Sequence, residues 1–232
     1  MCGRFGLAKK IEELQTAFAA LPLEVGLTPR YNIAPGQPVL GLAKSKVPGL
    51  PQWGWFHWGL VPSGAKTEPK EQGWINARCE TVGQKPAFRT SFERRRCVIV
   101  ADGFYEWQTQ GKQKRPFLFA RSNQEPFGLA AIWDRWSPGF GAPEQVTCAL
   151  LTTRANPLVG QIHDRMPVIL EPQAVGLWLY LTDLGQAAPL FEPYPAPKMT
   201  ACEVSSSVNS PQSDRLEGYA PLVGGQQLTF SP

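Results

Sequence analysis

The 232-residue sequence contains only two histidines, and its five cysteines include no Cys-x-x-Cys pair. An odd number of cysteines without such a pair argues against a disulfide framework and a zinc ribbon. No apolar run reaches the roughly 18 residues of a membrane helix, and the charged first twenty residues lack the apolar centre of a signal peptide. We therefore expect a cytoplasmic protein without a membrane segment, metal or cofactor. Four of the cysteines are expected to be core thiols: Cys79, Cys97, Cys148 and Cys202.

The balance of charge is only mildly basic. The formal net charge is +4 and the sequence pI is about 8.8, with 18% charged residues. This charge permits nucleic-acid binding but does not indicate it, because clustered Lys and Arg are the stronger signal. Eight tryptophans and 23 prolines favour a fold with many turns over a helical bundle.

Two segments have the periodicity of amphipathic helices, residues 9–20 and residues 172–181. Residues 22–52 are interrupted by prolines and are expected to form strands and turns. Short apolar runs typical of buried strands follow at 97–101, 117–120, 127–132 and 146–152, after an aromatic-rich run at 53–61. These patterns predict an α+β fold that is predominantly antiparallel β, with a barrel-like or sandwich-like core and a few short helices. We expect one domain over residues 2–221 and a C-terminal tail over 222–232.

Cys2 combines two nucleophiles once Met1 has been removed, which a small second residue usually permits. A free α-amine and a free thiol have pKa values of about 8 and 8.5, so both are partly nucleophilic near neutral pH. Together they condense with an aldehyde, since the amine forms a Schiff base and the thiolate then closes a thiazolidine ring. Taken alone, Cys2 is equally compatible with a frayed terminus.

Glu106 and His163 are candidates for proton transfer. Glu106 lies between Tyr105 and Trp107, where partial desolvation raises the pKa of a carboxyl group. His163 precedes Asp164 and follows a loop-like segment, a common setting for catalytic groups, whereas His57 lies in an aromatic strand and is expected to be structural. A solvent-exposed glutamate and an ordinary loop histidine are the alternatives.

Asn76 and Arg78 place an amide and a guanidinium on one face if their segment is a strand, which suits a phosphate or another oxygen-rich ligand. A polar outer face is the alternative. A basic run of five residues is most often a solvated surface, and it comprises Lys85, Arg89, Arg94, Arg95 and Arg96.

Several blocks in fixed order point to one family. They are Cys2 to Phe5, Arg30 to Pro35, Trp58 to Pro62, Trp74 to Thr81, Lys85 to Arg89, Ala101 to Trp107, His163 to Pro167 and Val204 to Asn209. On these blocks the chain resembles the SRAP family, the SOS-response-associated-peptidase-like proteins that covalently trap abasic sites in single-stranded DNA. The resemblance extends from Cys2 to about Pro221 and implies an SRAP-like single domain.

The resemblance also implies roles for four residues. Cys2 matches the nucleophile, and His163 matches the acid that opens the deoxyribose ring so that its aldehyde becomes available. Glu106 matches the glutamate that manages protons at the Cys2 amine and during ring closure. Asn76 matches the residue that positions the chain terminus. The implied product is a thiazolidine crosslink that protects the lesion.

The implied partner is single-stranded DNA with an abasic site, including junctions of single and double strand, bound by a monomer that associates with the nucleoid when on DNA. Arg4 and Arg78 are expected on phosphates, with Arg89 and Asn32 as weaker contacts and Pro35 near the point where a duplex is blocked. Such guanidinium contacts are independent of sequence and sensitive to salt.

One departure from the family concerns the residue after Pro62, where many members carry tryptophan and this chain reads Ser63-Gly64-Ala65. A base-stacking contact is therefore missing here or supplied by Trp74.

Two other functions remain open from the sequence. An N-terminal-nucleophile peptidase or amidohydrolase uses the Cys2 thiol against an amide, with its own amine as base and Asn76 at the oxyanion, and includes self-removal of Met1. A non-enzymatic nucleic-acid binder, with Cys2 incidental, is the third possibility.

Overall fold

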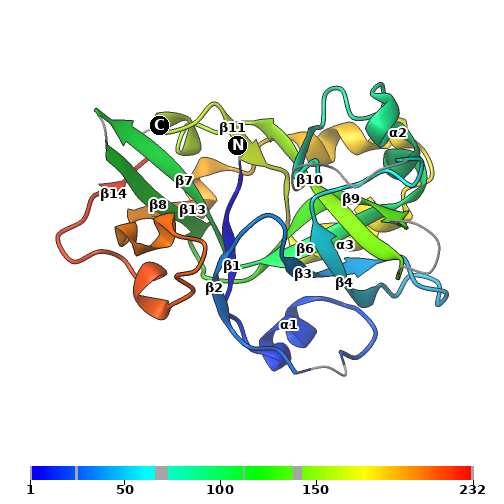
Figure 1. Ribbon diagram of the computed structural model, residues 1–232, viewed down its shortest axis with the longest axis horizontal. Helices are drawn as coiled ribbons and strands as arrows, with labels where there is room; N and C mark the ends of the chain where they lie inside the picture. Colours follow the sequence, from blue (N-terminus) through cyan, green and yellow to red (C-terminus); the bar gives the residue numbers. More distant parts are fainter. Residues whose placement is uncertain (1, 24–25, 66–72, 112, 138–142, 231–232) are drawn as a thin grey trace.

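A closed five-stranded barrel forms one half of the computed structural model, which describes residues 2–23, 26–65, 73–111, 113–137 and 143–230 (Figure 1). Its strands are β3 (Pro38–Ala43), β4 (Gln52–Trp58), β6 (Arg96–Ala101), β9 (Phe127–Trp136) and β10 (Gln145–Arg154). The pairing runs β10-β4-β3-β6-β9 and returns to β10, with β10–β4 parallel and the other pairs antiparallel. Because the barrel is closed, these strands expose no free edge.

Three short strands extend this barrel sheet. They are β5 (Asn76–Arg78), β11 (Arg165–Pro167) and β12 (Ile169–Leu170). β5 runs parallel to the end of β10, β11 runs antiparallel to it, and β12 pairs with β9. The far end of β10 therefore gathers segments that lie far apart in the sequence.

A second, six-stranded antiparallel sheet lies beside the barrel, on the left of Figure 1. Its order is β14-β13-β8-β7-β1-β2, where the strands are β1 (Phe5–Leu7), β2 (Arg30–Ile33), β7 (Gly103–Gln110), β8 (Gln113–Arg121), β13 (Met199–Glu203) and β14 (Gln227–Leu228). β7 follows β6 after Asp102 alone, so the chain passes from barrel to second sheet within one residue.

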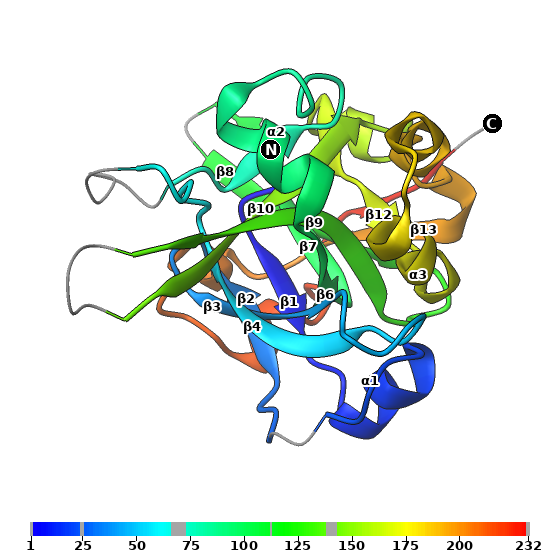
Figure 2. The ribbon, with the colours of Figure 1, turned by 90° about the vertical axis from the view of Figure 1, so that its right-hand side faces the viewer.

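Three α-helices surround the strands in the described part of the chain: α1 (Ile11–Ala17), α2 (Pro86–Arg94) and α3 (Pro172–Tyr180). Figure 2 shows α2 above the barrel, α3 to its right and α1 below. Five short 3-10 segments complete the described elements: residues 159–161, 184–191, 196–198, 206–209 and 216–218.

The predicted α+β fold with a mainly antiparallel core is confirmed, as are the helices at 9–20 and 172–181. The first helix is shorter than its periodic pattern, because the backbone is already extended at Phe18. Every predicted buried strand lies within an observed strand. Of the four expected core thiols, Cys79, Cys97 and Cys148 are buried, whereas Cys202 is half-buried on β13.

The helix α2 was not predicted, and the interpretation of Arg96 as part of a solvated basic surface is wrong. The Arg96 side chain is 8% exposed and donates hydrogen bonds to the carbonyls of Phe92 and Glu93 in α2 and of Trp178 in α3. A further bond goes to the carbonyl of Leu181, which caps α3. One guanidinium thus satisfies the exposed carbonyls at the ends of two helices, where a cation also complements the helix dipole.

The segment predicted as a C-terminal tail contributes structure as far as it is described. β14 pairs with β13, the amide of Leu222 donates to the carbonyl of Glu203 at 2.9 Å, and Leu228 is buried. Among the described helices, none has both the length and the apolar character needed to cross a membrane.

We expect Arg96→Met to lower the free energy of unfolding by about 3 kcal/mol, because it leaves buried carbonyls without donors. Arg96→Lys retains the charge without the planar fork and is expected to lose less. Urea unfolding measures both variants. Arg94→Met, at an exposed arginine on α2, is the matched control, and an equal loss in this control would contradict the assignment.

Candidate active site at the chain start

The chain start is held between the barrel and the second sheet. β1 pairs with β7 through Phe5 opposite Phe104, and the amide of Tyr105 donates to the carbonyl of Arg4 at 2.9 Å. On its other side the ring of Phe5 packs on Trp58 of the barrel strand β4, with ring centroids 5.1 Å apart. Residues 2–4 therefore continue along β7 toward Glu106, beside the end of β10 (Figure 1).

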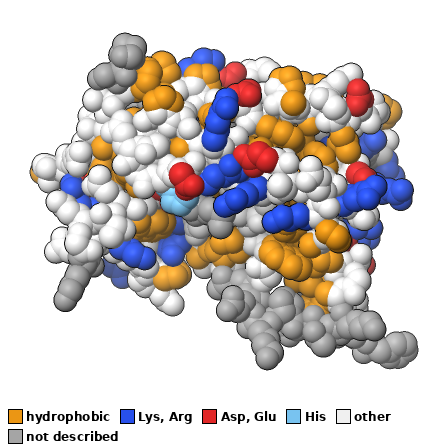
Figure 3. All heavy atoms as spheres, turned by 90° about the horizontal axis from the view of Figure 1, so that it is seen from above, with side chains coloured by type: hydrophobic (Ala, Val, Ile, Leu, Met, Phe, Trp, Pro, Cys, Tyr) orange, Lys and Arg blue, Asp and Glu red, His pale blue; other side chains and the backbone are white. Residues whose placement is uncertain are grey.

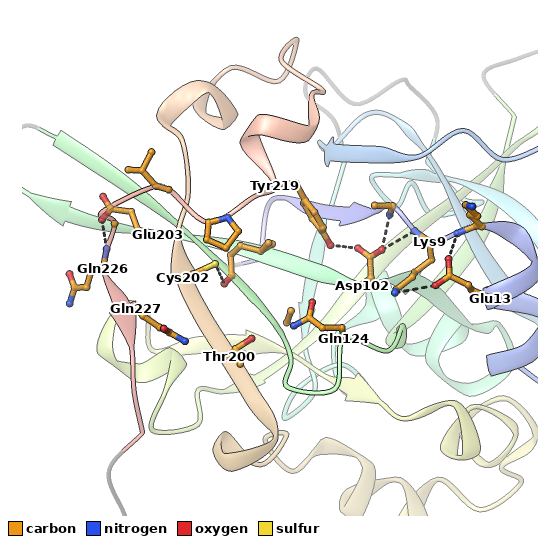
Figure 4. Close-up of a pocket in the computed structure, with 17 residues that line it drawn as sticks. Lys9, Glu13, Asp102, Gln124, Thr200, Cys202, Glu203, Tyr219, Gln226 and Gln227 are labelled. Carbon is orange, nitrogen blue, oxygen red and sulfur yellow. Dashed lines mark hydrogen bonds and ion pairs between the residues drawn. The ribbon is translucent and has the colours of Figure 1, made fainter.

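Asp102, at the step between barrel and second sheet, anchors the other end of β1. Its Oδ2 accepts hydrogen bonds from the amides of Ala8 and Lys9 at 2.7 and 3.0 Å, and its Oδ1 accepts one from the hydroxyl of Tyr219. Figure 4 shows Asp102 between Tyr219 and Lys9 at the border of a cavity of about 540 Å³. Burial raises the pKa of Asp102, and the three hydrogen bonds oppose that rise.

Cys2 is fully buried, which excludes a frayed terminus. The side-chain amide of Asn76 donates to the carbonyl of Cys2 at 2.8 Å. Asn76 is placed for this contact by β5, which pairs it with Leu150 of β10. Its Oδ1 is buried and has no hydrogen-bond partner among the described residues, so an acceptor remains next to the chain start.

Glu106 is the buried carboxyl group of the site. It is 4% exposed on β7, and burial raises its pKa, a rise that the nearby imidazole of His163 opposes. The predicted desolvation is therefore confirmed. Burial also raises the pKa of the Cys2 thiol, and the charge of Glu106 adds to that rise. Cys2, Glu106 and His163 thus form one electrostatically linked group.

His163 follows the 3-10 turn 159–161 and precedes β11, which pairs with the end of β10. Its Nδ1 accepts the amide N–H of Arg165 at 2.9 Å and lies 3.1 Å from the carboxylate of Asp164. These two contacts call for opposite protonation of Nδ1. The backbone contact is the more constrained one, whereas Asp164 is exposed, so we assign the neutral ring its proton on Nε2. The ring then presents an N–H on its other side.

Arg165 holds this loop and received no role from the sequence. Its guanidinium binds Glu80 at 2.5 and 2.8 Å and the carbonyl of Thr152 at 2.6 Å, which ties the segment after His163 to β10 and to the residues after β5. The signal available in the sequence was its place directly after His163-Asp164. Its partner Glu80 lies 85 residues away, so this ion pair could not be predicted from the sequence.

Arg4 and Asn32, both predicted to contact DNA, bind one another. Arg4 Nη1 donates to Asn32 Oδ1 and to the carbonyl of Val208, each at 2.8 Å, and its guanidinium lies 5.7 Å from the Trp107 ring centroid. Asn32 is 1% exposed, and its amide donates to the carbonyls of Ser210 and Ser213 at 3.0 and 2.7 Å. In this structure Asn32 positions Arg4 and the loop after β13.

The other predicted DNA contacts are accessible. Arg78 is exposed at the end of β5, and its side chain makes no ion pair with a described residue. Arg89 is exposed on α2 and pairs with Glu93 at 3.0 Å, while Pro35 is half-exposed in the turn after β2. Figure 3 looks onto the end of the molecule that carries the chain start, where basic side chains are interspersed with acidic ones.

Trp74, the predicted substitute for the missing tryptophan, is 49% exposed beside β5. Its ring meets Phe88 of α2 edge to face, with centroids 5.7 Å apart. Residues 66–72, which follow the Pro62 block, lie outside the described residues. Within the described part of the chain, no three His, Cys, Asp or Glu side chains gather closely enough to hold a metal ion.

We expect Glu106→Gln to stabilise the protein increasingly as pH rises. The folded pKa of Glu106 is raised above the unfolded value of about 4.3, so the native state binds more protons and wild-type stability falls as pH rises through this interval. A glutamine does not ionise. Thermal melts between about pH 4 and 8 are therefore expected to show a growing difference in Tm between variant and wild type. Glu217→Gln, at an exposed glutamate, is the control, and a difference independent of pH would count against the buried charge.

Comparison with known proteins identifies relatives over most of the chain. Abasic site processing protein YoqW of Bacillus subtilis is 38% identical over 223 residues, covering 94% of this chain and 98% of that protein. Abasic site processing protein YedK of Escherichia coli is 32% identical, covering 81% and 83% respectively.

Solved structures agree on the fold. A crystal structure of a protein from Bacteroides thetaiotaomicron superposes with a TM-score of 0.82 at 23% identity, over 95% of this chain and all of the other. One from Bordetella bronchiseptica gives a TM-score of 0.76 at 28% identity, over 88% of this chain. The family model described as SOS response associated peptidase (SRAP) matches residues 1–211, and the chain therefore belongs to the SRAP family.

Proposed function

We propose that this protein captures abasic sites in single-stranded DNA by forming a covalent bond through Cys2. The observation that carries the proposal is the buried chain start, whose Cys2 carbonyl is held by Asn76 beside the carboxyl group of Glu106. Such a placement brings a terminal amine and its thiol to one fixed position. The relatives named abasic site processing proteins support the same reaction class.

The proposed reaction begins after Met1 has been removed. The Cys2 amine adds to the aldehyde carbon of the ring-opened deoxyribose, and loss of one water molecule gives a Schiff base. The thiol then adds across the C=N bond, so that a C–S bond forms and the thiol proton goes to the nitrogen. The product is a thiazolidine, and its reversal requires breaking both the C–S and the C–N bond.

Three residues support these steps in the proposal. His163, with its proton on Nε2, donates to the sugar oxygen as the ring opens. Glu106, whose pKa is raised by burial, takes a proton from the amine and returns one during water loss. Asn76 keeps the backbone of Cys2 fixed, which lowers the entropic cost of bringing amine and aldehyde together.

The state of the thiol favours capture over peptide hydrolysis. A cysteine peptidase needs a thiolate for its first attack, but burial and Glu106 raise the pKa of the Cys2 thiol. In capture the amine attacks first, and the thiol reacts only afterwards, within the same molecule. A raised thiol pKa therefore slows the second step without preventing the first.

For DNA binding we propose that Arg78 contacts the phosphates next to the lesion, because it is exposed and unpaired within the described residues at the end of the strand that carries Asn76. Arg89 and Pro35 are proposed as outer contacts, the latter where a single strand meets a duplex. Arg4 and Asn32 are proposed to shape the floor of this path, given their mutual hydrogen bond. We propose that a monomer acts alone.

The crosslinking test uses an oligonucleotide with one abasic site, denaturing electrophoresis and intact mass. Wild-type protein is expected to give a heat-stable adduct with the mass of both components minus one water. Cys2→Ala retains a terminal amine but has no thiol, so it is expected to give only a reversible Schiff base. A heat-stable adduct of unchanged yield with Cys2→Ala would refute the thiazolidine.

Two further variants separate the roles in the same assay. His163→Ala is expected to slow adduct formation about 10²- to 10⁴-fold, the usual contribution of general acid catalysis, while the final yield is retained. A protein with an acetylated chain start is expected to form no adduct, since its amine is blocked. Peptide cleavage by the unmodified protein that is lost in Cys2→Ala, without formation of the DNA adduct, would instead favour the hydrolase, which uses the Cys2 thiol with its own amine as base.

For Arg78→Ala we expect weaker binding of undamaged single strands and a salt dependence reduced by about 0.7 in the slope of log K against log salt, the value for one lost phosphate contact. Fluorescence anisotropy between about 50 and 200 mM salt measures the slope. Arg154→Ala, at an exposed arginine that already pairs with Glu192, is the control. An unchanged slope in Arg78→Ala would contradict the proposed contact between Arg78 and a phosphate.

A further inference from the structure

The barrel has a second open end, opposite the one that carries the candidate active site. β3 ends there at Ala43, β4 begins at Gln52 and β10 begins at Gln145, whereas Asn76 and the His163 loop lie at the far end of β10. A cavity of about 640 Å³ lies at this end. Mouths of barrels are common binding sites, and cavities of about 300–1,000 Å³ accommodate small ligands.

Aromatic rings line this cavity. Phe56 of β4 and Trp133 of β9 lie on the same face of the closed sheet, and their rings meet edge to face with centroids 6.3 Å apart. Trp53 and Trp55 of β4 also line the cavity, and Trp55 is 45% exposed. Exposed aromatic rings of this kind are the surfaces on which unpaired bases stack.

Basic side chains lie around the aromatic rings in the described lining of this cavity. The mouth is lined by Lys44 and Lys46 from the β3–β4 turn, Arg94 from the end of α2 and Arg135 from β9, and none of its described lining residues is Asp or Glu. Figure 2 shows the three elements that supply them, with α2 above the β3–β4 turn and the β9–β10 pair reaching to the left.

Two of these cations are already engaged. Arg135 pairs with the exposed Glu144 at 3.3 Å, and Lys44 lies over the Tyr180 ring. Arg94 and Lys46 make no ion pair with any residue that the structure describes. Four positive charges on three elements exceed what one phosphate needs, and they match a chain of phosphates.

We propose that the barrel mouth is a second binding site for single-stranded nucleic acid, in which bases stack on its aromatic rings and phosphates lie along its basic rim. The site requires no abasic lesion and no reaction at Cys2. It binds the strand by stacking and charge, so it takes any base sequence.

The test measures binding of an undamaged thymidine oligomer of about 15 nucleotides by fluorescence anisotropy in the Arg78→Ala background, which removes the phosphate contact proposed at the other end. In this background Lys46→Glu with Arg94→Glu is expected to weaken binding at least tenfold and to lower the salt slope by about 1.4, the value for two phosphate contacts. Lys114→Glu with Arg215→Glu changes the net charge equally at exposed positions elsewhere and is expected to change affinity less than twofold. Equal losses in both pairs would overturn the proposal.

A second arm tests stacking. Trp133→Leu is expected to weaken binding by about 5- to 150-fold, the range for one lost base–aromatic contact. Circular dichroism checks whether this variant folds. If it does not, Trp55→Ala, at an exposed ring, provides the same test. Competition by a poly-glutamate peptide as strong as by the oligomer would identify a general polyanion surface and contradict the proposal. Displacement of the oligomer by thymidine monophosphate at equal concentrations would contradict a site for a strand.

Discussion

The rest of the candidate site depends on how β1 is held between the barrel and the second sheet. Three contacts at different levels fix it: Asp102 binds the amides of Ala8 and Lys9, the amide of Tyr105 binds the carbonyl of Arg4, and Asn76 binds the carbonyl of Cys2. Chain ends are usually mobile. Here the residues from Cys2 onward are held by hydrogen bonds to β7 and β5, so the groups of Cys2 lie at a fixed position.

This arrangement requires buried polar groups, and their electrostatics shape the chemistry. Burial raises the pKa of Glu106 and of the Cys2 thiol together, which disfavours two negative charges side by side. A carboxyl group with a raised pKa and a neutral thiol suit the proposed reaction, which begins with an amine and transfers protons to and from one carboxyl group. The buried Glu106 therefore links lower stability at neutral pH to the proposed catalysis, a common exchange at functional sites.

The sequence predicted the elements better than it predicted their partners. Apolar runs identified the strands that became β6, β8, β9 and β10, because a strand that is buried on both faces has a continuous run of apolar residues. Helix α2 was not predicted, because its buried rings Phe88 and Phe92 lie in a segment rich in arginine that we interpreted as a basic surface. Arg96 was wrongly interpreted as a surface residue, because its hydrogen-bond partners cannot be seen in the neighbouring sequence. Its four carbonyl partners come from two helices up to 85 residues away.

By itself, the sequence determined the types of groups available: a cysteine after Met1, a glutamate between aromatic residues, two histidines, and the motif blocks by which the family is recognised. Only the tertiary structure decided that the chain start is buried, that Asn76 reaches the Cys2 carbonyl, that Asn32 holds Arg4, and that the barrel opens onto a basic mouth. The physical reason is that these contacts join the residues before β1 to β5 and to β2, and join the β3–β4 turn to α2 and β9. The pairing of distant segments is determined by the packing of the whole chain, and it cannot be predicted from local periodicity.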